Sequence, residues 1–251
     1  MFDLHTHTLF SDGKNSAEEM VCEAIRLGLK RIGFSDHSGV CYDDCGMTEK
    51  TAEEYRAEIK RLKTEYAGRI EILCGLERDY YSEDNQAYDY VIGSVHALRM
   101  EDGHYICVDW DKDRLAADVL KYFHGDWYTF AEAYYETEAD VIRKTACDIV
   151  GHFDLLTIFN AGCRLFDTTH PRYRKAWKKA ADRLLEYGKT FEINTGAMSR
   201  GYRRAPYPSA EIREYLRTHG GRMILSSDAH RKEHIAYAFG RYFAALQGTK
   251  G

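Results

Sequence analysis

The sequence has little of what marks several large classes of protein. Only three of its 251 residues are proline, and no proline-, glycine- or serine-rich linker divides the chain. Its seven cysteines are scattered without a CxxC pair, which argues against a disulfide framework or a zinc knuckle. No apolar run reaches about 18 residues, and the start "MFDLHTHT" lacks the basic and apolar regions of a secretion signal. We therefore expect one cytoplasmic domain covering residues 1–251, without a membrane partner.

The chain also lacks an excess of positive charge. Its formal net charge of −5 argues against a surface that coats nucleic acid, so no nucleic-acid partner is expected. An anionic substrate remains compatible with this charge, because bound divalent cations would reverse it locally. With 44% apolar and 30% charged residues, the chain can fold around a sizeable core, and its composition does not indicate an oligomeric state.

Short apolar segments alternate with amphipathic helical patterns along the whole chain. The predicted strands are residues 1–5, 31–37, 70–77, 88–96, 147–152, 189–195 and 222–230, and the predicted helices are 15–30, 51–68, about 130–146, 173–187, 209–219 and a last one near the C-terminus. Continuous apolar strands flanked by helices are typical of parallel sheets covered on both faces. We therefore predict an α/β fold with a closed or nearly closed barrel of seven β/α units. An open doubly wound sheet is the alternative, although no GxGxxG or Walker motif follows any strand.

Two of the predicted helices carry specific local signals. Ser16 and Glu19 match a capping box at the start of the first helix. Tyr55, Ile59 and Leu62 form an apolar stripe along the second. The capping box predicts where the first helix begins, and the stripe predicts a buried face on the second.

Histidines and carboxylates recur where the predicted strands end. In "DLHTHTLFSDG", His5 and His7 are one residue apart, so both imidazoles point the same way in an extended segment. The carboxyl ends of barrel strands meet at one rim, where active sites are built. The predicted metal ligands at this rim are His5, His7, Asp12, His37, Glu77, His96, His152, Asp228 and His230. The histidines predicted to be surface or packing residues are His104, His124, His170, His219 and His234.

These six imidazoles and three carboxylates exceed the three or four protein ligands of a single zinc site. More than one ion is therefore predicted, unless each side chain separately caps a strand or fills the core. A nitrogen and oxygen donor set without cysteine suits Zn, Mn or Fe. Clustered divalent ions are well suited to the hydrolysis of phosphate esters, because they activate water and neutralise phosphate oxygens.

The motifs together resemble a known family. "DLHTHTLFSDG", "GFSDH", "GLE", "IGSVH", "VGHFDLL" and "SSDAH" resemble the polymerase and histidinol phosphatase (PHP) superfamily of metal-dependent phosphoesterases. Within it, "FEINTGAMSRGYRRAPYPS" is similar to the monofunctional histidinol-phosphate phosphatases. The resemblance runs from residue 2 to about residue 235. It implies a distorted seven-stranded TIM-like barrel with a trinuclear centre. We therefore expect two to three divalent ions as cofactors.

The resemblance also implies how the ligands are shared among the ions. The first ion would take His5, His7, Glu77 and Asp228; the second Glu77, His96 and His152; the third Asp12, His37 and His230. A bridging role suits Glu77, because a carboxylate has two oxygens whereas a neutral imidazole has one free nitrogen. Glu77, His230 and Arg200 are the predicted catalytic residues.

The resemblance also implies a basic clamp that binds phosphate. Arg200 lies past the sixth strand, where its guanidinium could hold two phosphate oxygens in a fork, unless it is a solvated loop arginine. Arg203 is a second candidate in the same basic run. Relatives commonly carry Lys or Arg a few residues after "HFDLL", where this chain has Ile158. Asn160 and Arg164 are the other predicted substrate-binding residues, with Arg164 a possible replacement for the second clamp.

The leading prediction is a phosphoric monoester hydrolase, a histidinol-phosphatase of histidine biosynthesis. A metal-bound hydroxide would attack phosphorus, and the leaving alkoxide would take a proton from a metal-bound water or a site histidine. The products would be L-histidinol and inorganic phosphate. One alternative is a phosphatase or phosphodiesterase for another small substrate, such as a nucleotide or sugar phosphate, or an exonuclease. Another is a non-catalytic protein with a structural metal site. The aromatic-rich residues 97–128 could shape the substrate pocket or simply pack.

Overall fold

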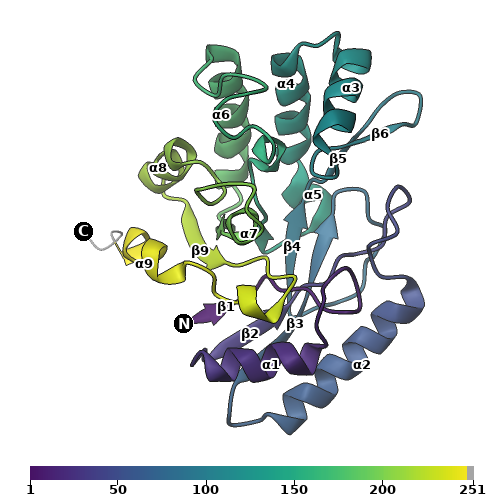
Figure 1. Cartoon of the computed structure of the whole chain (residues 1–251), viewed down its shortest axis with the longest axis vertical. Helices are drawn as coiled ribbons and strands as arrows, with labels where there is room; N and C mark the ends of the chain where they lie inside the picture. The colour runs from purple at the N-terminus through teal and green to yellow at the C-terminus, as the bar shows by residue number, and fades with distance from the viewer. Residues whose placement is uncertain (248–251) are drawn as a thin grey trace.

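Seven parallel strands form one sheet in the computed structural model, which describes residues 1–247 (Figure 1). They are β1 (Phe2–Asp3), β2 (Arg31–Phe34), β3 (Glu71–Asp79), β4 (Tyr90–Ser94), β7 (Ile149–Val150), β8 (Thr190–Asn194) and β9 (Arg222–Ser226). Each strand pairs with the next one of this list, so the order never reverses as it would in a doubly wound sheet. The seven-stranded α/β prediction is confirmed. The single-domain assignment of residues 1–251 stays a prediction, and residues 248–251 lie outside the described residues.

The segments that follow the first and last strands pair with each other, and this pairing nearly closes the sheet into a barrel. Thr6 forms a parallel bridge with Ala229. The amide of His7 donates to the carbonyl of Ala229 at 2.9 Å, and the amide of Ala229 donates to the carbonyl of His5 at 3.2 Å. The barrel therefore closes through segments that carry predicted metal ligands.

Helices cover the outside of this barrel. They are α1 (Ala17–Arg26), α2 (Glu49–Glu65), α3 (Lys112–Phe123), α4 (Trp127–Glu138), α5 (Val141–Thr145), α6 (Pro171–Leu185), α7 (Gly196–Ser199), α8 (Ala210–Thr218) and α9 (Phe239–Gln247), with 3₁₀ turns at Leu155–Thr157 and Lys232–His234. Ser16 and Glu19 form the predicted capping box of α1. Tyr55, Ile59 and Leu62 of α2 are fully buried, which confirms the apolar stripe. No helix within residues 1–247 is both long and apolar enough to span a membrane.

The long connection between β4 and β7 holds more structure than its sequence indicates. An antiparallel hairpin of β5 (Ala97–Arg99) and β6 (Tyr105–Cys107) precedes α3, and α4 and α5 occupy the stretch near 130–146 where at least one helix was predicted. The amide of Val108 donates to the carbonyl of His96 at 2.9 Å, so the hairpin is tied to the end of β4. In Figure 1, α3, α4 and α6 lie together at the end of the molecule opposite α1 and α2.

The apolar core lies between the barrel and these two groups of helices. One cluster includes Phe130 and Tyr134 of α4 with Trp177 of α6. A second cluster places Met20 and Tyr55 against the strands on the α1 and α2 side. Burial of these apolar side chains between helices and strands stabilises the barrel. The carboxyl ends of the strands can therefore carry polar side chains.

Candidate metal centre

The nine predicted ligands come together at one rim of the barrel. They lie in the segments after β1 (His5, His7, Asp12), after β2 (His37), within β3 (Glu77), after β4 (His96), after β7 (His152) and after β9 (Asp228, His230). The ring of His7 lies 4.4 Å from that of His37 and 4.1 Å from that of His230, between centroids. The topology therefore collects side chains that are up to 225 positions apart, from His5 to His230.

Glu77 stands at the middle of this group and is 1% exposed. Its Oε2 atom lies 3.2 Å from His5 Nε2 and 3.0 Å from His37 Nδ1. Its Oε1 atom lies 3.0 Å from His152 Nε2 and 3.3 Å from His96 Nε2. Because the two oxygens face different histidines, the carboxylate is oriented as a bridge between two sites would be.

Asp228 completes a compact group with the first two histidines. Its Oδ1 atom lies 3.3 Å from His7 Nε2 and 3.8 Å from His5 Nε2. Donor atoms of these three residues lie within 4.8 Å of one another. A Cβ atom at Gly196 would come within 2.6 Å of the Asp228 carboxylate, so glycine there leaves room for this ligand.

Asp12 reaches the rim from the loop after β1. Its Oδ2 atom lies 3.1 Å from His230 Nε2, and its Oδ1 atom lies 3.6 Å from His37 Nε2. Asp12, His7, His37 and His230 form a second group within the 4.8 Å limit. A Cβ atom at Gly13 would lie 2.6 Å from the backbone of His7, so this turn can pack closely enough to present Asp12.

A third group consists of His37, Glu77 and His96. His37 thus takes part in two groups, whereas the resemblance assigned it to one ion only. His152 lies next to Glu77 as the resemblance implied. The structure brings all nine residues together, and their division among individual ions stays a prediction.

Several donor atoms at this rim are buried without a hydrogen-bond partner in the described part of the chain. They are Nε2 of His5, both ring nitrogens of His7, Oδ1 of Asp12 and Oε2 of Glu77. Buried polar atoms without partners cost free energy, and native proteins contain few of them. Imidazole nitrogens and carboxylate oxygens are the ligands that Zn, Mn and Fe accept. The donor set therefore fits divalent cations.

Burial and neighbouring charges set the protonation of these ligands. Burial lowers the pKa of His7 to about 3, and the adjacent His230 and His37 add to this effect. Burial also opposes a charged His37, but the Glu77 and Asp12 carboxylates raise its pKa to about 9. For Glu77, burial is outweighed by His5, His37 and His96, which hold its pKa well below the usual range. A neutral His7 and an ionised Glu77 are the forms that bind metal.

Two further carboxylates orient the ligands, and sequence reasoning missed both. Glu192 Oε1 lies 2.7 Å from His5 Nδ1, and Asp79 Oδ2 lies 3.1 Å from His96 Nδ1. Each carboxylate accepts a hydrogen bond from Nδ1–H, which leaves the Nε2 atom of each imidazole free to face Glu77. A charged residue inside the apolar strand "KTFEINT" was the available signal for Glu192.

Arg200 lies at the C-terminus of α7, in contact with the ligand set. Its Nη2 atom donates to Asp228 Oδ2 at 3.1 Å, and its Nη1 atom lies 3.0 Å from His230 Nδ1. It lines a cavity of about 570 Å³ together with seven of the nine ligands. His234, predicted as a surface or packing residue, lines this cavity too. His234 lies in a 3₁₀ turn rather than at a strand end, so the strand-end pattern did not identify it.

The other predicted substrate-binding residues line a neighbouring cavity of about 800 Å³. Arg203 donates to Thr157 Oγ1 at 2.5 Å and lies over the ring of Tyr207. The Asn160 amide binds the backbone of Phe166. Arg164 is exposed on the same loop. The substrate role of Arg203, Asn160 and Arg164 stays a prediction. Ile158, at the position discussed above for a second basic clamp residue, lines the metal cavity.

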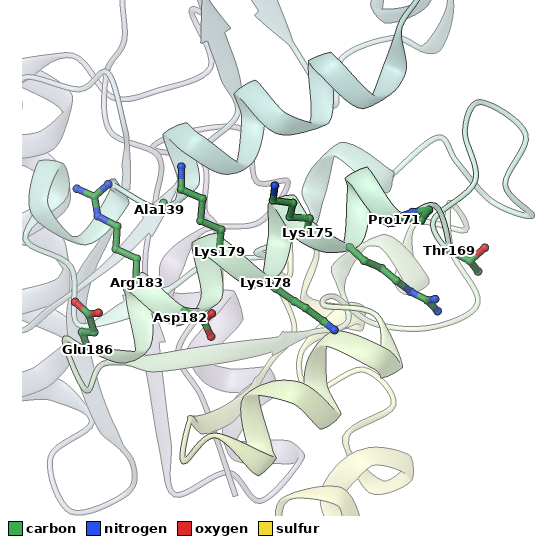
Figure 2. A pocket seen from close by; sticks show the side chains of 10 residues that line it. Ala139, Thr169, Pro171, Lys175, Lys178, Lys179, Asp182, Arg183 and Glu186 are labelled. Carbon is green, nitrogen blue, oxygen red and sulfur yellow. The ribbon is translucent and has the colours of Figure 1, made fainter.

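A larger hollow of about 910 Å³ runs along α6, and ligands of the metal centre do not line it. Figure 2 shows Lys175, Lys179 and Arg183 projecting from this helix. Lys179 lies 2.7 Å from Glu136, and Arg183 lies 3.5 Å from Asp140. Such ion pairs are typical of a solvated helix face, so the chemistry is expected at the barrel rim instead.

Comparisons with known proteins find relatives along most of the chain. A probable histidinol-phosphatase of Schizosaccharomyces pombe is 28% identical over 255 residues, which cover 90% of this chain and 79% of that protein. The structure of the Listeria monocytogenes protein hisK covers 96% of this chain and 100% of its own, with 20% identity and a TM-score of 0.83. Histidinol phosphate phosphatase from Lactococcus lactis, solved with Zn, L-histidinol and phosphate, covers 99% of this chain and 93% of its own, with 21% identity and a TM-score of 0.74. These structures share the fold described above.

A family model matches the part of the chain that carries most of the rim. The PHP domain matches residues 3–196, and these include seven of the nine predicted ligands, all except Asp228 and His230. The match covers well over half of the chain. The chain belongs to the PHP domain family.

Proposed function

We propose that this chain is a metal-dependent phosphomonoesterase that hydrolyses L-histidinol phosphate to L-histidinol and inorganic phosphate in histidine biosynthesis. The observation that carries the proposal is the buried Glu77 among five histidines, with Arg200 beside the same ligand set. The relative from S. pombe and the L. lactis structure with Zn, L-histidinol and phosphate support the choice of substrate. A cytoplasmic location, favoured by the odd number of scattered cysteines, is part of the proposal.

The rim would hold two or three divalent ions, of Zn, Mn or Fe. When bound, such ions lower the pKa of coordinated water and neutralise the charge of phosphate oxygens. Glu77 would join two sites through its two oxygens, while Glu192 and Asp79 keep the imidazoles of His5 and His96 in the orientation that binds.

Arg200 is the residue assigned to the phosphate itself. Asp228 and His230 hold its guanidinium at the edge of the ligand set, and the group remains partly exposed to the cavity. Two parallel N–H groups would donate to two phosphate oxygens and stabilise the charge that develops on them during hydrolysis. His230 lies between Arg200 and Asp12, close enough to take part in proton transfer.

The experiment offers the Zn-, Mn- and Fe-loaded protein a panel of esters and measures phosphate release. The panel contains L-histidinol phosphate, a nucleoside monophosphate, a sugar phosphate and a phosphodiester. We expect kcat/KM for L-histidinol phosphate to exceed that for the other monoesters by at least about tenfold, because a site built around its polar groups rejects analogues that lack them.

Other outcomes separate the alternatives. Equal rates on unrelated monoesters would contradict the substrate assignment and keep the phosphatase activity. Cleavage of the diester without turnover of monoesters would favour an exonuclease-like enzyme. A metal-loaded protein that hydrolyses none of the esters would favour the non-catalytic alternative.

A further inference from the structure

One carboxylate of the metal cavity takes no part in the centre described above. Asp109 lies between β6 and α3 and lines the same cavity as His96 and Arg200. Its Oδ1 atom is buried and has no hydrogen-bond partner among residues 1–247. The three groups of candidate metal ligands found in this part of the chain do not include it. The structure therefore shows an acceptor in the cavity that the metal centre does not use.

The backbone on both sides of Asp109 is fixed. The amide of Val108 donates to the carbonyl of His96, and the Val108 side chain is fully buried. On the other side, Trp110 Nε1 donates to Asp43 Oδ2 at 2.9 Å, and the guanidinium of Arg114 lies 4.8 Å from the Trp110 ring centroid. Asp109 is thus held in place relative to the ligand His96, as a preorganised binding group must be.

The surroundings of Asp109 favour a cationic partner. Burial raises the pKa of this carboxyl, while the neighbouring His96 and Arg200 act against that rise. His96 is assigned to metal and Arg200 to phosphate, so neither is assigned to Asp109. A buried carboxylate oxygen without a donor is unfavourable, and a ligand that brings a positively charged donor removes this cost.

We propose that Asp109 binds the ammonium group of an aminoalkyl phosphate, so that the cavity selects phosphate esters with a positive charge close to the ester oxygen. Arg200 would hold the phosphate, and Asp109, from the β6–α3 connection, would accept charge-assisted hydrogen bonds from the ammonium. The inference rests on the proposed function, since L-histidinol phosphate carries an amino group on the carbon next to its phosphate-bearing carbon. It assigns a specificity role to a residue that was not among the predicted substrate-binding residues.

The test compares matched pairs of esters that differ only in the amino group. The first pair is L-histidinol phosphate and its deaminated analogue, 3-(imidazol-4-yl)propyl phosphate; the second is 2-aminoethyl phosphate and ethyl phosphate. We expect the metal-loaded wild type to prefer the amino ester in kcat/KM by at least about 30-fold, and Asp109→Asn to reduce this preference by at least about tenfold. Asp113→Asn is the control, because Asp113 is an exposed carboxylate four residues after Asp109, and this variant should keep the wild-type preference.

The outcomes distinguish this inference from the proposed function. A wild type that prefers neither amino ester overturns the inference, whether or not the variant folds. Asp109→Asn that keeps the preference, or that loses bound metal in parallel with activity, also overturns it. A wild type that prefers 2-aminoethyl phosphate over ethyl phosphate but ignores L-histidinol phosphate would support the inference while contradicting the proposed substrate.

Discussion

Glu77 is the residue at this rim whose replacement we expect to affect both metal content and activity. It is buried, ionised and in contact with histidines from four different segments of the chain. In Glu77→Gln the size is kept, but the negative charge and one acceptor oxygen are lost. Because loss of residues that merely orient metal ligands costs about 10–100-fold, we expect kcat/KM to fall by at least about 100-fold, with a lower metal content by elemental analysis.

Glu71→Gln is the matched control, because Glu71 lies at the start of the same strand and is exposed. Its activity and metal content should equal those of the wild type. Full metal content and activity in Glu77→Gln would mean that this carboxylate does not bridge the ions.

Arg200 gives a second prediction at the residue scale. Arg200→Met removes the guanidinium that is assigned to phosphate, so we expect kcat/KM for the phosphate ester to fall by about 10²–10³-fold in steady-state assays. Arg204→Met, four residues further along and exposed, should change it little. Equal losses in the two variants would point to a general effect of positive charge rather than to a clamp.

At the scale of elements, the regular part of each predicted strand could be located from its apolar run, but its end could not. β1 pairs regularly only over Phe2–Asp3, because Thr6 bridges to Ala229 across the barrel closure instead. That pairing depends on a segment more than 220 positions away in the sequence. The rim itself was predictable, because His5, His7 and Glu77 each follow or lie in a short apolar strand, and parallel strands share one carboxyl edge.

The orienting carboxylates and the β5–β6 hairpin were not predictable in the same way. Asp79 is adjacent to His96 only because β3 and β4 pair in the observed register, with Asp79 opposite Ser94. The hairpin strands are three residues each, too short for a period of two to stand out. Asp109 owes its position to that hairpin, so it too was visible only in three dimensions.

Helix α4 contains a buried carboxylate whose effect on the free energy of unfolding depends on pH. Burial raises the pKa of Glu138 well above its ordinary value, and its Oε2 atom has no hydrogen-bond partner within residues 1–247. A raised native pKa means that the folded state holds the proton more tightly, so this group's contribution to stability is full below about pH 4.5 and falls as pH rises from there towards the native pKa.

We therefore predict that Glu138→Gln is more stable than the wild type at pH 8, by about 1 kcal/mol or more, because the buried charge is removed. The gain should be much smaller at about pH 4, where the wild-type carboxyl is protonated in the folded state and mostly protonated in the unfolded state. Urea unfolding of both proteins at the two pH values measures it. A gain that is equal at both pH values would assign the effect to packing instead of ionisation.

For the whole molecule, the metal centre connects segments that follow five strands and lies where the barrel closes. Ions that bind only the folded state stabilise it, by about 2.7 kcal/mol when their concentration is 100 times Kd. For a chain of this size each kcal/mol shifts Tm by about 2–4 °C.

Removal of metal with a chelator should therefore lower Tm by about 5–10 °C, and adding back Zn or Mn should restore it, in differential scanning calorimetry. Glu77→Gln should show a smaller shift than the wild type. Identical Tm values with and without metal in the wild type would argue that the rim holds no ion in the folded state.

The most direct test of the metal centre is anomalous diffraction from crystals of the metal-loaded protein, recorded at the absorption edge of the bound metal. We predict two or three anomalous peaks at the rim, at about 2.0–2.2 Å from nitrogen and oxygen atoms of the nine ligands if the metal is Zn, with Glu77 in contact with two of them. Peaks only at cysteines or on the outer surface, with none next to Glu77, would contradict the account.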